Sequence, residues 1–279
     1  MHVIADVDAA SEARLLRDWL SAFDRVFVLT GAGCSTASGI PDYRDEAGGW
    51  KRKPPVTYQA FTQDDETRRR YWARSFAGWP VFSTAQPNRA HRALAEWEAT
   101  GRMSMLLTQN VDTLHQRAGS RHVIDLHGRL DTIRCLDCGD LTPREAMQQR
   151  LADANAGWID TIAAFAPDGD ADLERTDFRD FVIPACTCCG GMLKPDVVFF
   201  GENVPRARFE HARDALAASD ALLVVGSSLM VYSGFRFARM AHEAGTPIAL
   251  LTRGSTRADE LASLALRADC TVVLPDALG

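Results

Sequence analysis

The sequence predicts an α/β fold in which a doubly wound, Rossmann-like parallel sheet is joined to a second, smaller domain. Three observations predict this fold class. Short apolar runs alternate with stretches of helical periodicity, and most of these runs are too apolar to leave one face in water. Four cysteines also form two C-x-x-C pairs in a stretch where the alternation stops. Strands that are apolar on both faces are typical of parallel sheets covered by helices on each side.

Seven apolar runs bounded by turn residues are predicted as strands. They span residues 26–30, 103–108, 123–126, 197–200, 221–226, 248–252 and 271–274. Helices are predicted over residues 12–23, 90–98, 206–218 and 233–244. Strands and helices that alternate in this way indicate the repeating units of a single doubly wound sheet.

Two stretches interrupt the alternation of strands and helices. Residues 42–85 contain a loop rich in Gly and Pro followed by a charged run, and residues 129–195 contain both cysteine pairs around an acidic segment. We predict that these two stretches together form the smaller domain. The larger domain is then made of residues 1–41, 86–128 and 196–279.

Composition excludes several classes of protein. The chain has 279 residues and a net charge of −6, because 31 Lys and Arg stand against 37 Asp and Glu, so direct nucleic-acid binding is not expected. No apolar run approaches the roughly 18 residues of a membrane span, and the acidic opening is not typical of a targeting segment. The seven cysteines favour metal binding in a reducing compartment, which predicts a cytoplasmic protein.

A glycine turn follows the first predicted strand. Gly31, Gly33 and Ser35 lie between that strand and a helix start, where backbone N–H groups approach a pyrophosphate closely. The strict G-x-G-x-x-G pattern is broken, because Thr36 stands where the third glycine would be. The turn therefore predicts a phosphate cradle, while a tight turn without a ligand remains the alternative.

The two C-x-x-C pairs predict a zinc site. Cys135 and Cys138 are separated by 47 residues from Cys186 and Cys189, and two such pairs supply four thiolates to one tetrahedral ion. Four protein ligands leave no position for a reactive water, so this Zn²⁺ would be structural, with one ion per chain. Cys188 competes with Cys189 for the fourth position, and unpaired buried thiols are the other alternative.

Polar side chains follow two further strands. Gln109, Asn110 and Asp112 come after the second predicted strand, and His127 comes after the third. Ligands of open α/β sheets bind beyond the carboxyl ends of the strands, so these side chains are expected to converge on one crevice. A single histidine is more often structural than catalytic. His127, however, lies directly after a strand, where a general base could reach a bound ligand, and an ordinary histidine pKa near 6.5 suits that role.

A second small-residue turn follows the strand predicted over 221–226. Gly226, Ser227 and Ser228 have the backbone freedom and the hydroxyl groups to hold a second phosphate or a ribose. The same residues would otherwise form a routine helix N-cap.

Together these segments resemble the sirtuin family of NAD-dependent protein-lysine deacylases along nearly the whole chain. The resemblance rests on GAGCSTASGIPDYR at 31–44, TQNVD at 108–112, LHG at 126–128, the two cysteine pairs, KPDVVFFGE at 194–202 and GSSL at 226–229. A closer likeness, to the class II group that includes the mitochondrial lipoamidase-type sirtuin, rests on residues 71–80, 135–139 and 227–234.

The resemblance implies that the chain cleaves NAD to nicotinamide and transfers an acyl group from a lysine of a protein substrate to form O-acyl-ADP-ribose. It implies that His127 is a general base and that Asn110 is also catalytic. The positions that it implies for NAD binding are Gly31, Ala32, Gly33, Ser35, Thr36, Ile40, Pro41, Asp42, Tyr43, Arg44, Gln109, Asn110, Asp112, His127, Gly226, Ser227, Ser228, Thr252, Gly254 and Cys270. The positions that it implies for the substrate are Tyr71, Arg74, Phe200, Gly201, Glu202 and Val231.

The chain departs from the family pattern at two positions. Cys34 replaces a common isoleucine, which places either a thiol beside the cofactor or a small apolar filler in the core. Thr252 stands where an asparagine often binds the adenosine ribose.

The acyl preference and the reaction type leave alternatives open. Tyr71 and Arg74 share a helical face, which suggests a bulky or acidic acyl group, unless Arg74 pairs with a nearby acid. Mono-ADP-ribosyl transfer and a catalytically silent NAD- and zinc-binding module are the alternative functions, and the sequence leaves the oligomeric state open.

Overall fold

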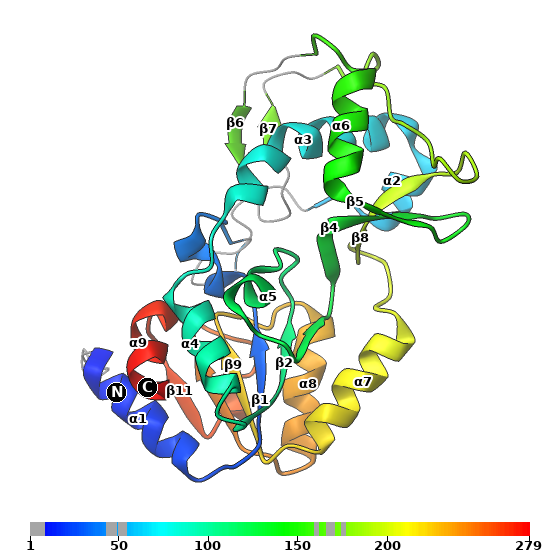
Figure 1. Cartoon of the computed structure of the whole chain (residues 1–279). Helices are drawn as coiled ribbons and strands as arrows, with labels where there is room; N and C mark the ends of the chain where they lie inside the picture. The colour runs from blue at the N-terminus through cyan, green and yellow to red at the C-terminus, as the bar shows by residue number, and fades with distance from the viewer. Residues whose placement is uncertain (1–8, 43–48, 50–54, 159–161, 166–170, 174–176) are drawn as a thin grey trace.

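Six parallel strands form one open sheet in the computed structural model, which describes residues 9–42, 49, 55–158, 162–165, 171–173 and 177–279 (Figure 1). The strands are β1 (Val26–Thr30), β2 (Met103–Thr108), β3 (Val123–Asp125), β9 (Ala221–Val225), β10 (Ile248–Leu251) and β11 (Leu264–Leu266). Their spatial order is β3-β2-β1-β9-β10-β11, and every neighbouring pair is parallel. This is the strand order of a doubly wound Rossmann sheet, so the predicted fold class is confirmed.

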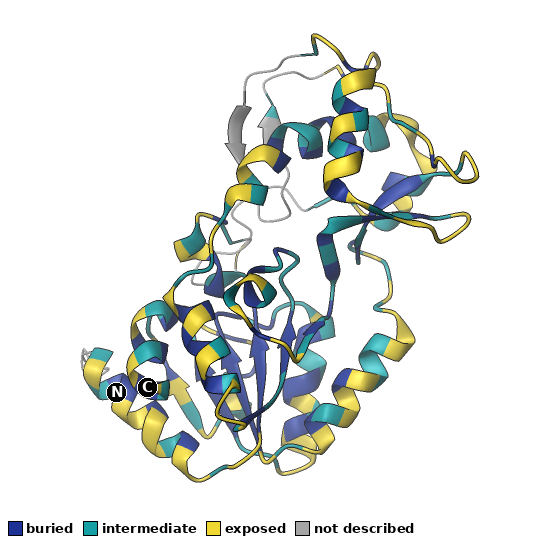
Figure 2. Cartoon of the chain, in the orientation of Figure 1, coloured by how far each residue is buried: buried dark blue, intermediate teal, exposed yellow. Residues whose placement is uncertain are grey.

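Helices cover both faces of this sheet. The helices on one face are α1 (Ala9–Ser21), α4 (Arg89–Glu98) and α9 (Cys270–Leu278), and those on the other are α7 (Arg206–Ala217) and α8 (Tyr232–Glu243). Alternate residues of β1 supply the two cores, because Val26 and Val28 face the first set and Phe27 and Leu29 the second. Every residue of β1 is buried, and the sheet is dark in Figure 2.

A smaller body lies beyond the end of this sheet in Figure 1. It contains an antiparallel sheet of β5 (Leu141–Pro143), β4 (Gly128–Cys135) and β8 (Leu193–Val197), together with α2 (Tyr58–Gln63), α3 (Asp65–Thr84) and α6 (Arg144–Ala154). These elements share a third core around Trp72 and Phe181, and β6 (Ile162–Phe165) pairs with β7 (Ala171–Leu173). The α5 helix (Leu114–Ala118) contacts α4. The exact domain boundaries stay a prediction.

Two predicted strands are wrong, one strand of the parallel sheet, β11, was not predicted, and neither were β4, β5, β6 and β7 of the smaller body. Residues 271–274 lie inside the helix α9, whose first turn is capped by the Asp269 carboxylate through the N–H of Thr271. A short apolar run does not distinguish a buried strand from a helix face. Residues 197–200 do not join the parallel sheet, because β8 ends at Val197 and pairs antiparallel with β4. The edge strand β11 has three residues, too few to show a period.

Candidate active site and metal centre

A cavity of about 550 Å³ opens where the strand order reverses between β1 and β9. The connections that follow these two strands diverge there, and in doubly wound sheets this is where ligands bind. The loops after β1, β2, β9 and β10 line the cavity, and residues 197–204 close it from the side of the smaller body. The structure therefore supplies the crevice that the sequence predicted at the strand ends.

The glycines of the first turn allow two loops to pack closely behind the cavity. The N–H of Gly33 donates to Gly226 O at 2.8 Å. A Cβ at Gly33 would lie 2.9 Å from that oxygen, and a Cβ at Gly31 would lie 2.7 Å from the Cβ of Ser227. Real Cβ atoms do not approach other atoms so closely, so a larger residue at either position would push the loops apart. The short helices η1 (Ala32–Cys34) and η2 (Thr36–Ser38) continue from this turn.

A polar network follows β2 at the cavity floor. The Ser35 hydroxyl donates to Asp112 Oδ2 at 2.6 Å, and the Asn110 amide donates to Gly31 O and to Ser35 Oγ, both at 3.0 Å. Asp112 also accepts the N–H of Leu114. Burial raises the pKa of Asp112, while the hydrogen bonds from Ser35 and Leu114 act in the opposite sense. The side chains of Asn110 and Asp112 are thus fixed in place before any ligand binds.

His127 lies in the same cavity with hydrogen bonds at both ring nitrogens. Nδ1 is 2.9 Å from Gln109 O, and Nε2 is 2.7 Å from Ser233 Oγ. A carbonyl oxygen accepts only, so we assign the proton to Nδ1 and the lone pair to Nε2. Burial is the main cause that lowers the pKa of His127 to about 4, with Arg208 and Arg236 acting in the same direction. The imidazole is therefore neutral near pH 7, as a general base must be.

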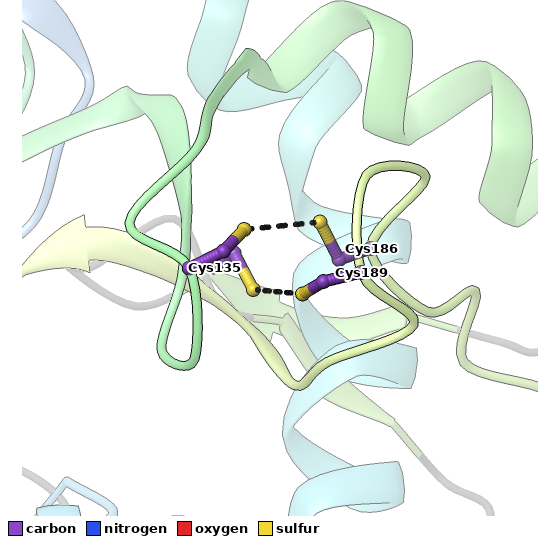
Figure 3. Close-up of side chains that lie close together, drawn as sticks. Cys135, Cys186 and Cys189 are labelled. Carbon is purple, nitrogen blue, oxygen red and sulfur yellow. Dashed lines mark hydrogen bonds between the residues drawn. The ribbon is translucent and has the colours of Figure 1, made fainter.

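Four thiols form the predicted metal cluster in the smaller body. Cys135 Sγ lies 3.5 Å from Cys189 Sγ, and Cys138 Sγ lies 3.8 Å from Cys186 Sγ (Figure 3). All four sulfurs lie within 4.8 Å of one another, and none of the cysteines is in a disulfide. Tetrahedral Zn²⁺ with bonds of about 2.3 Å places its sulfur ligands roughly 3.8 Å apart. The thiols thus fit a structural zinc ion.

Comparison with known proteins decides the family. Residues 31–233 match the family model described as "Sir2 family". The chain belongs to the Sir2, or sirtuin, family. It is 60% identical over 259 residues to NAD-dependent protein deacetylase 2 of Bradyrhizobium diazoefficiens, covering 93% of this chain and 95% of that protein. It is 61% identical over 259 residues to the NAD-dependent protein deacetylase of Xanthomonas campestris, covering 93% and 88% respectively.

Solved sirtuin structures share the fold of the whole chain. One, described as "Sir2 bound to acetylated peptide", has a TM-score of 0.75 and 28% identity, and the match covers 94% of each chain. Another, described as "Sir2-p53 peptide-NAD+", has a TM-score of 0.73 and 29% identity, covering 92% of this chain and 93% of that one. The predicted cofactors, NAD and structural zinc, agree with the NAD-dependent relatives and with the cysteine cluster.

Most positions predicted for this sirtuin lie around the one cavity. Those of the predicted NAD set that line it are Gly31, Ala32, Gly33, Ser35, Thr36, Ile40, Asp42, Gln109, Asn110, Asp112, His127, Gly226, Ser227, Ser228, Thr252, Gly254 and Cys270. Those of the predicted substrate set are Tyr71, Phe200, Gly201, Glu202 and Val231. The roles of these residues stay predictions.

Two of the predicted positions do not line this cavity, and two others lie outside the described residues. Pro41 lines a neighbouring pocket, and Arg74 is absent from the cavity lining although Tyr71 is in it. Tyr43 and Arg44 lie outside the described residues. Cys34 is fully buried in the core against the sheet, as the filler interpretation expected.

Sequence reasoning also missed several residues of the cavity lining, among them Ser233 and Arg236. Ser233 and Arg236 line the cavity on the first turn of α8, and Ser233 contacts the predicted base. The segment containing Ser233 was noted for its likeness to one sirtuin class, but nothing in the chain order places a helix start beside His127.

Proposed function

We propose that this sirtuin is an NAD-dependent protein deacetylase that acts on acylated lysine side chains and forms nicotinamide and O-acyl-ADP-ribose. One observation supports it above the others: a neutral imidazole, with its lone pair on Nε2, lies in the cavity that the glycine turn lines. The relatives that carry the name NAD-dependent protein deacetylase match more than nine-tenths of the chain.

The chain would bind NAD with the loops that follow β1, β9 and β10. NAD supplies an activated ribose, whose nicotinamide leaves as the acyl oxygen of the lysine attacks the anomeric carbon. We infer that Asp112 holds the nicotinamide carboxamide, and that Asn110 and Gln109 position the ribose. Nε2 of His127 would then take the proton of a ribose hydroxyl, whose oxygen attacks the acyl carbon, and water would release the free lysine and the acylated ADP-ribose. Removal of water by the narrow cavity would limit simple hydrolysis of the co-substrate.

The substrate peptide would lie between two segments at the cavity mouth. Phe200 and Gly201 line one side, and Val231 lines the other. Lys194 donates to Glu202 at 3.0 Å, and the N–H of Phe199 donates to the same carboxylate at 2.8 Å, so the first segment is well fixed. We infer that the peptide adds as a strand between them, which makes recognition depend on backbone as well as side chains.

His127→Ala tests the proposed function. The variant should keep its zinc content and its affinity for NAD but lose deacetylation of an acetyl-lysine peptide by about 100-fold or more, as expected for a general base. Mass spectrometry of the products separates the alternatives. Free acylated ADP-ribose supports deacylation, whereas ADP-ribose attached to a protein acceptor would support mono-ADP-ribosyl transfer. Absence of nicotinamide release in the wild-type protein would support the silent binding module.

We further propose a class II, lipoamidase-like preference for large or acidic acyl groups. Tyr71 lines the cavity from α3, where it packs edge-on against Phe61. A panel of acetyl, succinyl, glutaryl, methylglutaryl and lipoyl peptides would rank the preference. Arg74→Met should lower the rate with acidic acyl groups far more than with acetyl if Arg74 reaches the acyl carboxylate during turnover. Equal losses would remove Arg74 from this role.

The predicted cytoplasmic location stays a proposal that rests on the seven free thiols. Among the helices that the structure describes, none has the length and the apolar character to cross a membrane.

A further inference from the structure

The Ser233 hydroxyl is hydrogen-bonded to Nε2 of His127, the nitrogen with which a general base would accept a proton. The two side chains both line the cavity, and Oγ lies 2.7 Å from Nε2. Because Nδ1 donates its proton to Gln109 O, the neutral ring has a single lone pair, on Nε2. The serine hydroxyl is the donor to that lone pair. A ribose hydroxyl cannot give its proton to Nε2 while Ser233 holds it.

The first turn of α8 is built to hold Ser233 at this place. A Cβ on Gly234 would overlap the side-chain amide of Gln109, so a glycine lets the turn approach His127. Arg236 Nε donates to Ser233 O at 3.2 Å, and the Arg236 guanidinium lies 3.8 Å from the centre of the Phe209 ring. The serine is therefore fixed by its own helix and by α7.

The surroundings of His127 leave Nε2 without a proton of its own. Burial lowers the pKa of His127, the hydrogen bond to Gln109 O opposes this, and Arg208 on α7 and Arg236 on α8 act in the same direction as burial. Near neutral pH the lone pair of Nε2 is thus available, and the neighbouring hydroxyl is the donor that satisfies it.

We propose that Ser233 is a positioning residue that masks His127 Nε2 in the cofactor-free enzyme and yields this nitrogen to a ribose hydroxyl of the bound dinucleotide. The inference rests on the proposed role of His127 as the base. The exchange breaks one hydrogen bond and forms another, and it requires only rotation of the Ser233 side chain. Ser233 thus sets how readily the base becomes available.

Chemical modification tests the mask without any turnover. Diethyl pyrocarbonate acylates an imidazole nitrogen through its free lone pair, and peptide mass spectrometry distinguishes His127 from the other six histidines. Ser233→Ala should raise the modification rate of His127 about two- to tenfold, the range that corresponds to the net free energy of one hydrogen bond. Ser233→Thr, which keeps the hydroxyl, should restore the slow rate. Ser255→Ala, at another serine of the cavity lining, should leave the modification rate of His127 at its wild-type value.

Calorimetry gives a second measurement. Ser233→Ala should bind NAD about two- to tenfold more tightly, because the ribose no longer competes with the serine hydroxyl. Nitrogen NMR of the unmutated protein should show that only the Nε2 resonance of His127 shifts strongly when ADP-ribose saturates the cavity. Equal modification rates in the wild-type and Ser233→Ala proteins would overturn the mask. If the His127→Ala variant instead kept its deacetylase activity, that result would overturn the proposed function.

Discussion

The side chains of the cavity have their charge set by burial as much as by residue type. Asp112 is buried and His127 is half-buried, and the loss of hydration lowers the pKa of His127 and raises the pKa of Asp112. In each case the neutral form gains. The sequence suggested an ordinary histidine pKa near 6.5, and the structure corrects it to about 4, because burial and the charges of Arg208 and Arg236 outweigh the hydrogen bond to Gln109 O, which raises the pKa.

This shift predicts the pH dependence of the reaction. The neutral base is the active form, and a lowered pKa keeps it neutral to lower pH, so kcat/KM should stay flat with respect to His127 from pH 8 down to roughly pH 5. Rates with an acetylated peptide at subsaturating substrate, across this range, measure it. An acid limb with a midpoint near pH 6.5 would contradict the buried, neutral imidazole.

Among the elements, β4 joins the cavity to the metal centre. It begins at Gly128, directly after the proposed base His127, and it ends at Cys135 of the four-sulfur cluster, so one strand connects the two sites. Gly128 has a φ of 82°, and a Cβ there would overlap Asp196 O on β8. The glycine therefore allows β4 and β8 to pair directly beside the base.

Gly128→Ala should therefore lower the free energy of unfolding strongly. Gly101 also has a positive φ, 80°, but its added Cβ would meet nothing within 4 Å, so it is the matched control. Gly101→Ala should lower the free energy of unfolding by about 1–2 kcal/mol from backbone strain, and Gly128→Ala by about 2–5 kcal/mol from strain plus overlap. Urea unfolding compares the two variants. Equal losses would show that β8 moves away at no cost.

The two cysteine turns offer another matched pair. Cys189 lies in the four-sulfur cluster, whereas Cys188 is an exposed neighbour outside it. Cys189→Ser should lose zinc and unfold the smaller body first, since structural zinc contributes on the order of 10 kcal/mol in small modules. Cys188→Ser should keep one zinc per chain. Zinc content per chain and thermal unfolding of both variants test this prediction. Zinc loss in both variants would contradict the assignment of Cys189 as the fourth ligand.

At the scale of the whole molecule, two buried histidines, His91 and His115, and the half-buried His127 link stability to pH. Burial lowers the pKa of His127 and His91 to about 4, and that of His115 well below its usual value. Each group is neutral when folded but protonates near pH 6.5 when unfolded. Their stabilisation is complete above pH 6.5 and is lost as the pH falls toward 4, because the unfolded chain then binds more protons.

We expect His91 alone to cost about 2 kcal/mol of stability between pH 7 and pH 5. His91→Gln should remove that part of the pH dependence, and its amide still suits the third helical position of α4, where His91 completes a capping box. His122→Gln is the control, because the His122 side chain is 69% exposed. Urea unfolding at both pH values measures the effect, and identical pH slopes for wild type and His91→Gln would contradict it.

How much of the molecule was predictable depends on how local the signal is. The fold class, the four zinc ligands and the cavity position of His127 followed from apolar runs, spacing and strand-end positions along the chain. The prediction of a strand at 271–274 was wrong, because four apolar residues suit a helix face as well as a strand. The place of Ser233 beside His127 was not predicted, because this contact joins residues 106 positions apart in the sequence.

The amino-acid sequence by itself determined which residues could do chemistry. The patterns that revealed them are local: turn glycines, thiol pairs and polar residues after apolar strands. Such patterns can be recognised from residues that are neighbours in the sequence. Only the tertiary structure decided the protonation of His127 and the hydroxyl that holds its Nε2, and it removed Cys188 as the alternative zinc ligand. Those properties depend on burial and on distances between remote segments, and such distances exist only once α8 and β4 have packed against the strand ends.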